Sequence, residues 1–337
     1  MRAYRLPQPS GIDALAVADL PVPEPGDRQI LVQVAACSLN HRDLSIAAGA
    51  YRMPPRPNVI PLSDGAGTVA ATGRGVTRFK VGDRVAGCFF QRWVGGDAPA
   101  NAQASALGGA IDGMLAEYVV LEEDGAVAVP AHLSDEEAAT LPCAALTAWH
   151  ALIEHGRLTA GQTVLVQGTG GVSIFALQLA RLAGAVVIAT SSSDDKLAQA
   201  KALGATHTIN YRRTPDWEAA ARDLTGGAGV DQVVEVGGAG TIARSLAAIR
   251  VGGRVSLIGL LSGAASIDPM LILAKRANVQ GISVGSAQMF EAMNRAIAAG
   301  ALKPVINKAF GFDEAPAAYR YLKSGAHFGK VVVRVGS

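Results

Sequence analysis

In the middle of the chain, short apolar runs typical of strands alternate with segments whose apolar residues have helical spacing. Short apolar runs typical of buried strands occur at 164–166, 186–189, 230–235 and 255–259, and we expect a last strand at 281–285. Residues 172–183 have the spacing of one apolar helix face, and a second helix is expected to begin at Ser193. Strands that alternate with helices at this spacing predict right-handed crossovers and a parallel, doubly wound sheet.

The first 130 residues and the tail have a different pattern. Segments 30–36 and 115–120 are strand-like, residues 81–85 carry a turn into another strand, and residues 91–112 are typical of a loop. Ser134 opens a capping box and a helix. The tail predicts a helix at 310–321 and a strand at 329–333. The sequence therefore predicts an α/β protein with a mostly β part and a doubly wound part.

Composition narrows the class of protein. Of the 337 residues, 50% are hydrophobic and 17% are charged, with 39 glycines, which is typical of a globular α/β enzyme of two domains. The formal net charge of +2 gives no reason to expect a nucleic-acid partner. No apolar segment is long enough to predict a membrane span. The three cysteines are far apart and suggest no disulfide framework, so we expect a cytoplasmic protein.

A glycine turn follows the strand at 164–166 and precedes the helix at 172–183. Gly168 permits a sharp turn, Gly170 lets the backbone approach phosphate, and the helix that starts at Gly171 and Val172 presents free amides to a pyrophosphate. Ser173 stands where the third glycine of the dinucleotide fingerprint is usual. The turn predicts a dinucleotide site, and the alternative is an ordinary strand–helix turn.

The end of the second strand bears on the choice between NADPH and NADH. An NAD site usually has an acidic residue there, whereas this chain has a run of serines that includes Ser191 and Ser192. Their hydroxyls can bind a 2′-phosphate, to which Lys196 adds charge, and Tyr211 follows the next strand. These residues favour NADPH. The serines could equally cap a helix, which leaves NADH open.

The chain resembles the medium-chain dehydrogenase/reductase superfamily along nearly its whole length. The motifs that carry the resemblance are the glycine turn and the segments at 39–43, 61–67, 82–85, 146–149 and 327–330. The resemblance implies a GroES-like catalytic domain at 1–130 and 287–337, and a Rossmann cofactor-binding domain at 131–286. It also implies that Thr147, Gly259 and Lys330 contact the cofactor, and that the protein is a homodimer paired through the last Rossmann strand.

The zinc ligands of the metal-dependent members are missing from this sequence. Those members have a Cys where Asn40 stands and Gly-His-Glu where Leu62, Ser63 and Asp64 stand; Cys143 remains as a soft ligand. Their four-cysteine structural lobe is also absent, because the corresponding region has only Cys88. We therefore expect no metal, although Asp64 could still contribute a carboxylate.

The chain is then similar to the zinc-independent quinone oxidoreductases and enoyl reductases, although its glycine turn is one residue shorter than theirs. Without a metal, side chains must stabilise the charge that develops on the acceptor oxygen. The predicted donors are Asn40 and Tyr51, with Ser63 in second rank and Asp43 as an orienting group.

These observations predict an NADPH-dependent, zinc-independent oxidoreductase that reduces a quinone, an enone or a related small carbonyl compound. Two alternatives stay open at this point. One is a metal-free alcohol dehydrogenase or carbonyl reductase on the same fold, and the other is an NADPH-binding protein without catalytic activity.

Overall fold

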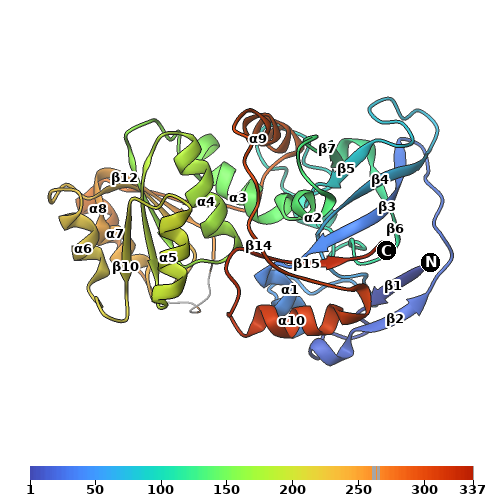
Figure 1. Cartoon of the computed structure of the whole chain (residues 1–337), viewed down its shortest axis with the longest axis horizontal. Coiled ribbons are helices and arrows are strands. Elements are labelled where there is room, and N and C mark those ends of the chain that lie inside the picture. The colour runs from blue at the N-terminus through green and yellow to red at the C-terminus, as the bar shows by residue number, and fades with distance from the viewer. Residues whose placement is uncertain (260–262, 264–265, 337) are drawn as a thin grey trace. The chain divides into compact units, whose positions relative to one another are not determined.

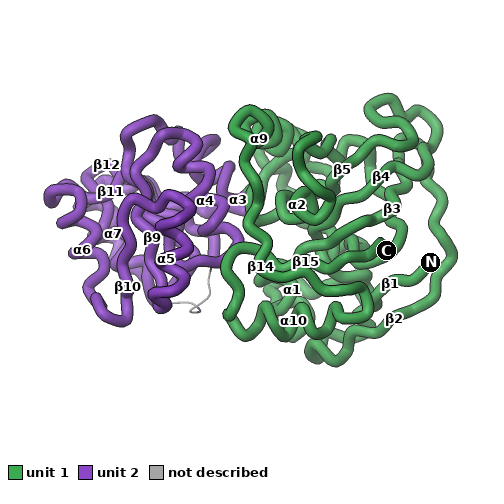
Figure 2. Tube along the Cα trace, viewed as in Figure 1, with its two compact units in different colours: residues 1–146, 284–337 green, residues 147–283 purple. Residues whose placement is uncertain are grey.

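The computed structural model describes residues 1–259, 263 and 266–336, and they form two compact units. The first unit contains residues 1–146 and 284–337, and the second contains residues 147–283 (Figure 2). The domain boundaries at 130/131 and 286/287 that the resemblance implies stay predictions. The compact units divide at 146/147 and 283/284, and the buried segment Leu141–Ala145 belongs to the first unit, where the Cys143 amide donates to the Asp64 carboxylate of β4.

The first unit is built on a seven-stranded sheet in the order β14-β15-β3-β4-β5-β7, with β6 paired to β3 (Figure 1). A separate hairpin-like pair is formed by β1 and β2. The strands are β1 (Arg2–Arg5), β2 (Ala16–Asp19), β3 (Gln29–Ser38), β4 (Asp64–Thr72), β5 (Arg84–Gly87), β6 (Tyr118–Glu122), β7 (Ala126–Ala128), β14 (Ile306–Phe310) and β15 (Lys330–Arg334). The helices that accompany them are α1 (His41–Ala47), α2 (Asp135–Ala139), α9 (Ala287–Ala299) and α10 (Ala315–Lys323).

Strand β3 is the centre of this sheet because it pairs with three other strands. It runs antiparallel to β4, β6 and β15, and Ser38 near its end pairs with Asp64 of β4 and with Val332 of β15. Three segments that are far apart in the sequence therefore meet at one end of β3.

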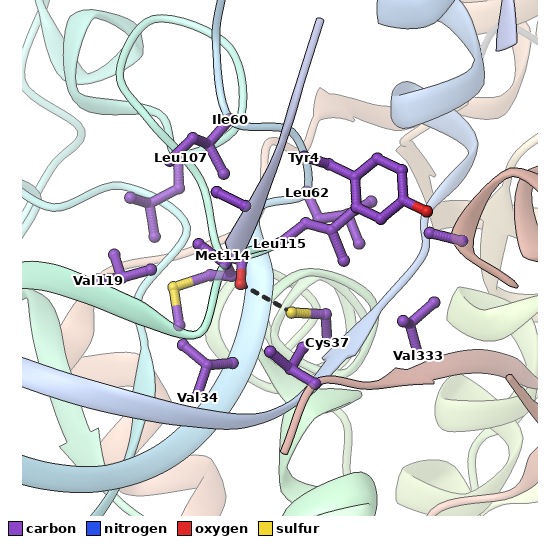
Figure 3. Packing of buried hydrophobic residues seen from close by; sticks show 14 of the residues in the cluster. Tyr4, Val34, Cys37, Ile60, Leu62, Leu107, Met114, Leu115, Val119 and Val333 are labelled. Carbon is purple, nitrogen blue, oxygen red and sulfur yellow. Dashed lines mark hydrogen bonds between the residues drawn. The ribbon is translucent and has the colours of Figure 1, made fainter. Parts of the chain in front are cut away.

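A continuous apolar core packs against this sheet (Figure 3). Tyr4, Val34, Leu115 and Val333 come from four distant segments and are all at most 3% exposed. The Cys37 thiol donates a hydrogen bond of 2.9 Å to the Met114 carbonyl, so Cys37 behaves as a small buried residue of this core.

The second unit is a six-stranded parallel sheet in the order β10-β9-β8-β11-β12-β13. Its strands are β8 (Thr163–Gln167), β9 (Val186–Ser191), β10 (His207–Asn210), β11 (Val230–Glu235), β12 (Ile249–Leu257) and β13 (Asn278–Gly281). Its helices are α4 (Gly171–Leu182), α5 (Asp194–Ala202), α6 (Trp217–Asp223), α7 (Ile242–Ala248) and α8 (Pro269–Lys275). The order of the strands reverses at β8, and the expected doubly wound sheet of a Rossmann fold is confirmed.

Helices cover both faces of this parallel sheet. Helices α4 and α5 pack on β8, β9 and β10, whereas α7 and α8 pack on β11 and β12, and α6 lies against α7 (Figure 1). Because all the strands of this sheet are parallel, their carboxyl ends lie at one edge, where open α/β sheets bind ligands.

Two predicted elements were wrong in position. The strand expected at 281–285 is β13 at Asn278–Gly281, because Val284 has φ of 48° and cannot extend a strand. The helix expected at 310–321 is divided, because Phe310 ends β14 and the helix α10 starts only at Ala315, next to a proline that favours a first helical turn. None of the described helices is both long and apolar enough to cross a membrane.

Candidate active site

Asn40 lies at the junction between β3 and α1, directly after the strand end that pairs with β4 and β15. Its backbone amide donates a hydrogen bond of 2.7 Å to the Asp43 carboxylate, as a residue that caps a helix start often does. Its side-chain Oδ1 accepts a hydrogen bond of 2.6 Å from the Lys330 ammonium, which comes from β15. Asn40 is therefore fixed by a local contact and by a contact 290 residues away in sequence.

Lys330 is a buried cation with only 3% of its surface exposed. Its Nζ donates to the Leu39 carbonyl at 2.7 Å and to Asn40 Oδ1 at 2.6 Å, and it lies 4.0 Å from Asp64 Oδ2. A buried ammonium is costly unless it is paired and hydrogen-bonded, and both conditions are met here. The two short contacts join Lys330 to the Leu39–Asn40 segment, and the longer one joins it to an acid.

Asp64 starts β4 and is fully buried. It accepts hydrogen bonds from Ser63 Oγ at 2.7 Å and from the Cys143 backbone amide at 3.2 Å. Burial raises the pKa of Asp64, while the Lys330 charge opposes that rise. The predicted donor Ser63 thus has its hydroxyl proton engaged by Asp64.

Asp43 is the second buried carboxyl of this cluster and is 2% exposed. Burial raises its pKa to about 6, and the charge of Arg42 and the hydrogen bond from the Asn40 amide partly offset that rise. Its Oδ1 has no hydrogen-bond partner among the described residues. Asp43 therefore binds the Asn40 backbone amide, and its role as an orienting group in catalysis stays a prediction.

Tyr51 lies beside Arg42. It is not at the centre of the Asn40 cluster, by which we mean Asn40, Asp43, Asp64 and Lys330. The Arg42 guanidinium stands 5.3 Å from the Tyr51 ring centroid and 4.5 Å from that of Phe89, and it donates to the Leu107 carbonyl at 2.8 Å. These contacts hold the tyrosine ring half-buried. Its role as a donor to substrate stays a prediction.

The second unit contains a cavity of about 440 Å³ at the carboxyl ends of its strands. Gln167 and Gly168 bring the end of β8 to it, and Thr190 brings β9. Its other lining residues come from the loops after β10 and β11 and from α6 and α7: Tyr211, Pro215, Trp217, Val236, Gly237, Gly240, Thr241 and Arg244. The cavity lies where the strand order reverses, which is where this fold binds nucleotides.

The glycine turn has the backbone that the sequence pattern required. Gly168 has φ of 71°, a left-handed conformation that favours glycine. Gly170 is the residue before helix α4, and Gly171 and Val172 form its first turn. Ser173 Oγ donates a hydrogen bond of 2.6 Å to the Gln167 carbonyl, directly before the turn. The serine is therefore accommodated at the position where a third glycine is usual.

The predicted 2′-phosphate residues lie at the end of β9 and the start of α5. Ser191 is the last residue of β9, Ser192 follows it, and Ser193 caps α5 by accepting a hydrogen bond of 3.4 Å from the Lys196 amide. Burial lowers the pKa of Lys196. Tyr211 lines the cavity, as does Arg244, a residue that sequence reasoning missed.

A buried carboxylate organises the loop on the other side of the cavity. Glu235 ends β11 and is fully buried. It accepts five hydrogen bonds, from the backbone amides of Gly237 (2.8 Å) and Gly238 (2.9 Å) and from the side chains of Thr241 (2.6 Å), Gln167 (2.8 Å) and Ser245. Because Gln167 precedes the glycine turn, Glu235 joins that turn to the loop after β11. Nothing in the local sequence pattern around Glu235 marked it as functional.

The remaining predicted cofactor residues lie in both units. Gly259 follows β12, and a Cβ there would stand 2.2 Å from the Val236 carbonyl, so only glycine fits against that loop. Thr147 is buried in the second unit, in α3 (Leu146–Trp149). Lys330 lies in the first unit, where its ammonium donates hydrogen bonds to the Leu39 carbonyl and to Asn40 Oδ1. Contacts of these three residues with a cofactor stay predictions.

Comparison with known proteins agrees with this architecture. Residues 26–131 match the family model described as an alcohol dehydrogenase GroES-like domain, and residues 171–299 match the model described as a zinc-binding dehydrogenase. A zinc-type alcohol dehydrogenase-like protein of Schizosaccharomyces pombe is 45% identical over 97% of this chain and 96% of its own length. The quinone oxidoreductase of Rattus norvegicus is 29% identical over 99% of this chain and 97% of its own.

Two solved structures extend the comparison. An NAD-dependent alcohol dehydrogenase is 36% identical with a TM-score of 0.90, and the match covers 100% of both chains. A mycobacterial protein solved as a complex with NADPH is 28% identical with a TM-score of 0.85, and the match covers 99% of this chain and 100% of that one.

The two units, the nucleotide-type sheet and these relatives define an oxidoreductase of the alcohol dehydrogenase type. The chain belongs to the medium-chain dehydrogenase/reductase superfamily, with a GroES-like domain and a Rossmann domain. The relatives are named as enzymes, so the interpretation as an NADPH-binding protein without catalytic activity gains no support.

A zinc ion, which the description of one family model implies, does not fit the residues around Asn40. Zinc is held by Cys, His and carboxylate ligands, and the described residues include no group of three or more such side chains that could hold a metal. Asn40 presents an amide instead, and Ser63 presents a hydroxyl that is bonded to Asp64. The Lys330 ammonium, 4.0 Å from Asp64, adds a positive charge beside these groups.

Proposed function

We propose that this protein is an NADPH-dependent, zinc-independent oxidoreductase that reduces a quinone, an enone or a related carbonyl compound. The observation that carries the proposal is the Asn40 cluster, in which the Lys330 ammonium is hydrogen-bonded to the amide that stands where the metal-dependent members of the superfamily have a cysteine. Such a cluster offers an acceptor oxygen hydrogen-bond donors in place of a Lewis acid. A conjugated acceptor delocalises the charge that hydride transfer creates, so weaker donors suffice for it.

In this proposal, NADPH supplies the hydride, and the protein orients the acceptor and stabilises its oxygen. Asn40 Nδ2 is the donor to the acceptor oxygen, because it is buried and has no well-formed hydrogen bond among the described residues. The proximity of the Asn40 amide nevertheless lowers the pKa of Asp64, so this donor lies near that carboxyl. Tyr51 is proposed as a second donor.

The preference for NADPH rests on the charge around the cavity of the second unit. Arg244 and Tyr211 line it, and none of its described lining residues is acidic. The serines at 191 and 192 and the Lys196 side chain add hydroxyls and a positive charge at the end of β9. A site with this charge favours a 2′-phosphate over a bare ribose hydroxyl pair.

An acceptor screen tests the proposal. NADPH oxidation is followed by absorbance with quinones, enones, aldehydes and simple ketones, and we expect turnover of the conjugated acceptors above all. Asn40→Ala should lower kcat by roughly 100-fold or more, the usual loss when one such donor is removed. Asn101→Ala, at an exposed asparagine of the first unit, is the matched control and should leave kcat unchanged.

The second candidate function is a metal-free alcohol dehydrogenase or carbonyl reductase, which the S. pombe relative and the NAD-dependent solved structure favour by their names. Faster oxidation of an alcohol than reduction of any conjugated acceptor, with no added metal, would favour this candidate. The absence of turnover with every acceptor despite tight NADPH binding would reject both candidates.

We also propose a cytoplasmic homodimer paired through β13, the edge strand of the second sheet. Among the described residues β13 pairs with β12 alone, so its other edge is available. An edge strand with free backbone groups readily pairs with another strand. Light scattering of the purified protein should give twice the chain mass, and a monomer mass would reject the dimer.

A further inference from the structure

We propose that Lys330 is a positioning residue that fixes the Asn40 amide with its nitrogen presented as the hydrogen-bond donor. In this arrangement the lysine ammonium supplies the fixed positive charge that a metal ion would supply in a metal-dependent enzyme. The inference rests on the proposed function, because it explains how Asn40 becomes a donor for the acceptor oxygen.

The direction of the Asn40 amide follows from the chemistry of its partner. An ammonium has three donors and no acceptor, so the atom that stands 2.6 Å from Lys330 Nζ must be the amide oxygen. The amide nitrogen then lies away from the ammonium and near the Asp64 carboxyl, whose pKa the Asn40 side chain lowers. It is buried and has no well-formed hydrogen-bond partner among the described residues. A buried donor without a partner is rare, and a ligand oxygen would satisfy it.

Lys330 lies closer to the Asn40 side chain than to the Asp64 carboxylate. Its two short hydrogen bonds, of 2.7 and 2.6 Å, go to the Leu39 carbonyl and the Asn40 side chain, whereas Asp64 Oδ2 is 4.0 Å away. Asp64 has its own donors in Ser63 and the Cys143 amide. A lysine present only to neutralise Asp64 would be expected to make its shortest contact with that carboxylate.

The strand register makes this geometry stiff. Val332 of β15 pairs with Ser38 of β3, and Lys330 itself pairs with Ile306 of β14. The Leu39 amide also donates to the Val331 carbonyl at 3.0 Å. The backbone of Lys330 is therefore fixed beside the Leu39–Asn40 segment.

The cation also strengthens the donor. A positive charge on the amide oxygen draws electron density from the nitrogen, so the N–H bonds become more polar. The effect is large in a buried site, where water does not screen the charge. The pair of Lys330 and Asn40 thus offers an acceptor oxygen a polarised donor that needs no reorganisation during the reaction.

The test compares Lys330→Met with Lys323→Met, an exposed lysine of α10 in the same unit. Lys330→Met should lower kcat for a conjugated acceptor by roughly 100-fold, with the Kd for NADPH within about twofold of wild type. Lys323→Met should change neither. A fall in NADPH affinity with kcat unchanged would overturn the proposal and assign Lys330 to the cofactor.

A double variant separates positioning from charge neutralisation. Lys330→Met leaves Asp64 buried without a cation and can destabilise the chain, so Lys330→Met is also combined with Asp64→Asn. We expect the double variant to regain thermal stability and to remain about 100-fold slow in kcat. Recovery of kcat to within about threefold of wild type would overturn the proposal, because charge balance would then be the whole role of Lys330.

A readout without turnover keeps this inference distinct from the proposed function. In protein labelled with ¹⁵N-asparagine, the Asn40 side-chain resonance is identified by its loss in Asn40→Asp. That resonance should shift in Lys330→Met and not in Lys323→Met, and an unchanged resonance would overturn the proposed contact. If the wild type reduces no acceptor, the proposed function fails while the resonance still tests the contact.

Discussion

Replacement of Glu235 by glutamine should weaken cofactor binding although Glu235 need not touch the cofactor. The carboxylate accepts five hydrogen bonds, and three of them come from the loop at residues 237–241, which also lines the cavity. Glutamine has one acceptor oxygen, so it can keep the bonds to Gly237, Gly238 and Thr241 only as neutral ones. Its new NH₂ group would face Gln167 Nε2, where two donors repel, whereas the Ser245 hydroxyl can turn to accept a hydrogen bond from that group.

The expected cost follows from these contacts. A hydrogen bond to a charged group contributes about 1.5–3 kcal/mol and a neutral one about 1 kcal/mol, so one broken and three weakened bonds amount to about 3 kcal/mol or more. Part of this lost free energy makes the loop at residues 237–241 less ordered in the free protein. Cofactor binding must then order that loop. A loss of about 1.4 kcal/mol in binding corresponds to a tenfold rise in Kd, and we expect at least that rise for NADPH.

Urea unfolding and NADPH titration measure the two effects. Trp217 is buried in the same unit and reports its unfolding by fluorescence, and Asp223→Asn is the matched control at an exposed carboxyl. Wild-type values of both the unfolding free energy and the Kd in Glu235→Gln would refute the reasoning. A stability loss without a change in Kd would refute only the link between the loop and the cofactor.

Three further predictions concern the pKa of the Asp43 carboxyl, the choice between NADPH and NADH, and the zinc content of the protein. Burial raises the pKa of Asp43 from 3.8 to about 6, so the native state binds this proton more tightly than the unfolded state, and the contribution of Asp43 to stability falls as pH rises from about 4 to 6. Asp43→Asn removes that titration, so unfolding at several pH values should favour the variant by up to about 3 kcal/mol at pH 7 relative to pH 4; a difference that does not vary with pH would contradict this. Lys196→Ala should weaken NADPH far more than NADH in binding titrations, and equal weakening would remove Lys196 from the 2′-phosphate. Metal analysis after dialysis should find well under one zinc per chain, and stoichiometric zinc would overturn the metal-free proposal.

The sequence predicted the second unit well because its signals are local. Each strand, turn and helix there carries its own apolar period, and parallel crossovers leave few topologies open. The strand at 230–235 and the helix after Gly170 occur where the pattern placed them. The first unit was predicted less completely, because strands of four or five residues such as β1, β2 and β14 are too short to carry a clear periodic signal.

In the candidate site too, residues with a local sequence signal were predicted and those brought together by the fold were not. Asn40 and Asp43 could be selected from sequence because they lie in one short segment that resembles the zinc-independent members of the superfamily. Lys330 was selected for another role, because its partner is 290 residues away and only the strand register brings them together. A lysine ahead of three valines in a buried strand was the one signal that pointed to an unusual environment. Arg244 and Glu235 gave no such signal.

The position of β15 has a consequence for the order in which the protein becomes active during synthesis. Residues 147–283 form a contiguous unit that can leave the ribosome complete, whereas the first unit must wait for residues 284–337. Until β15 docks onto β3, Asn40 has no cation beside it and the sheet lacks one of its inner strands. A nascent chain therefore completes the residues of its Rossmann unit before the Lys330 ammonium can reach Asn40.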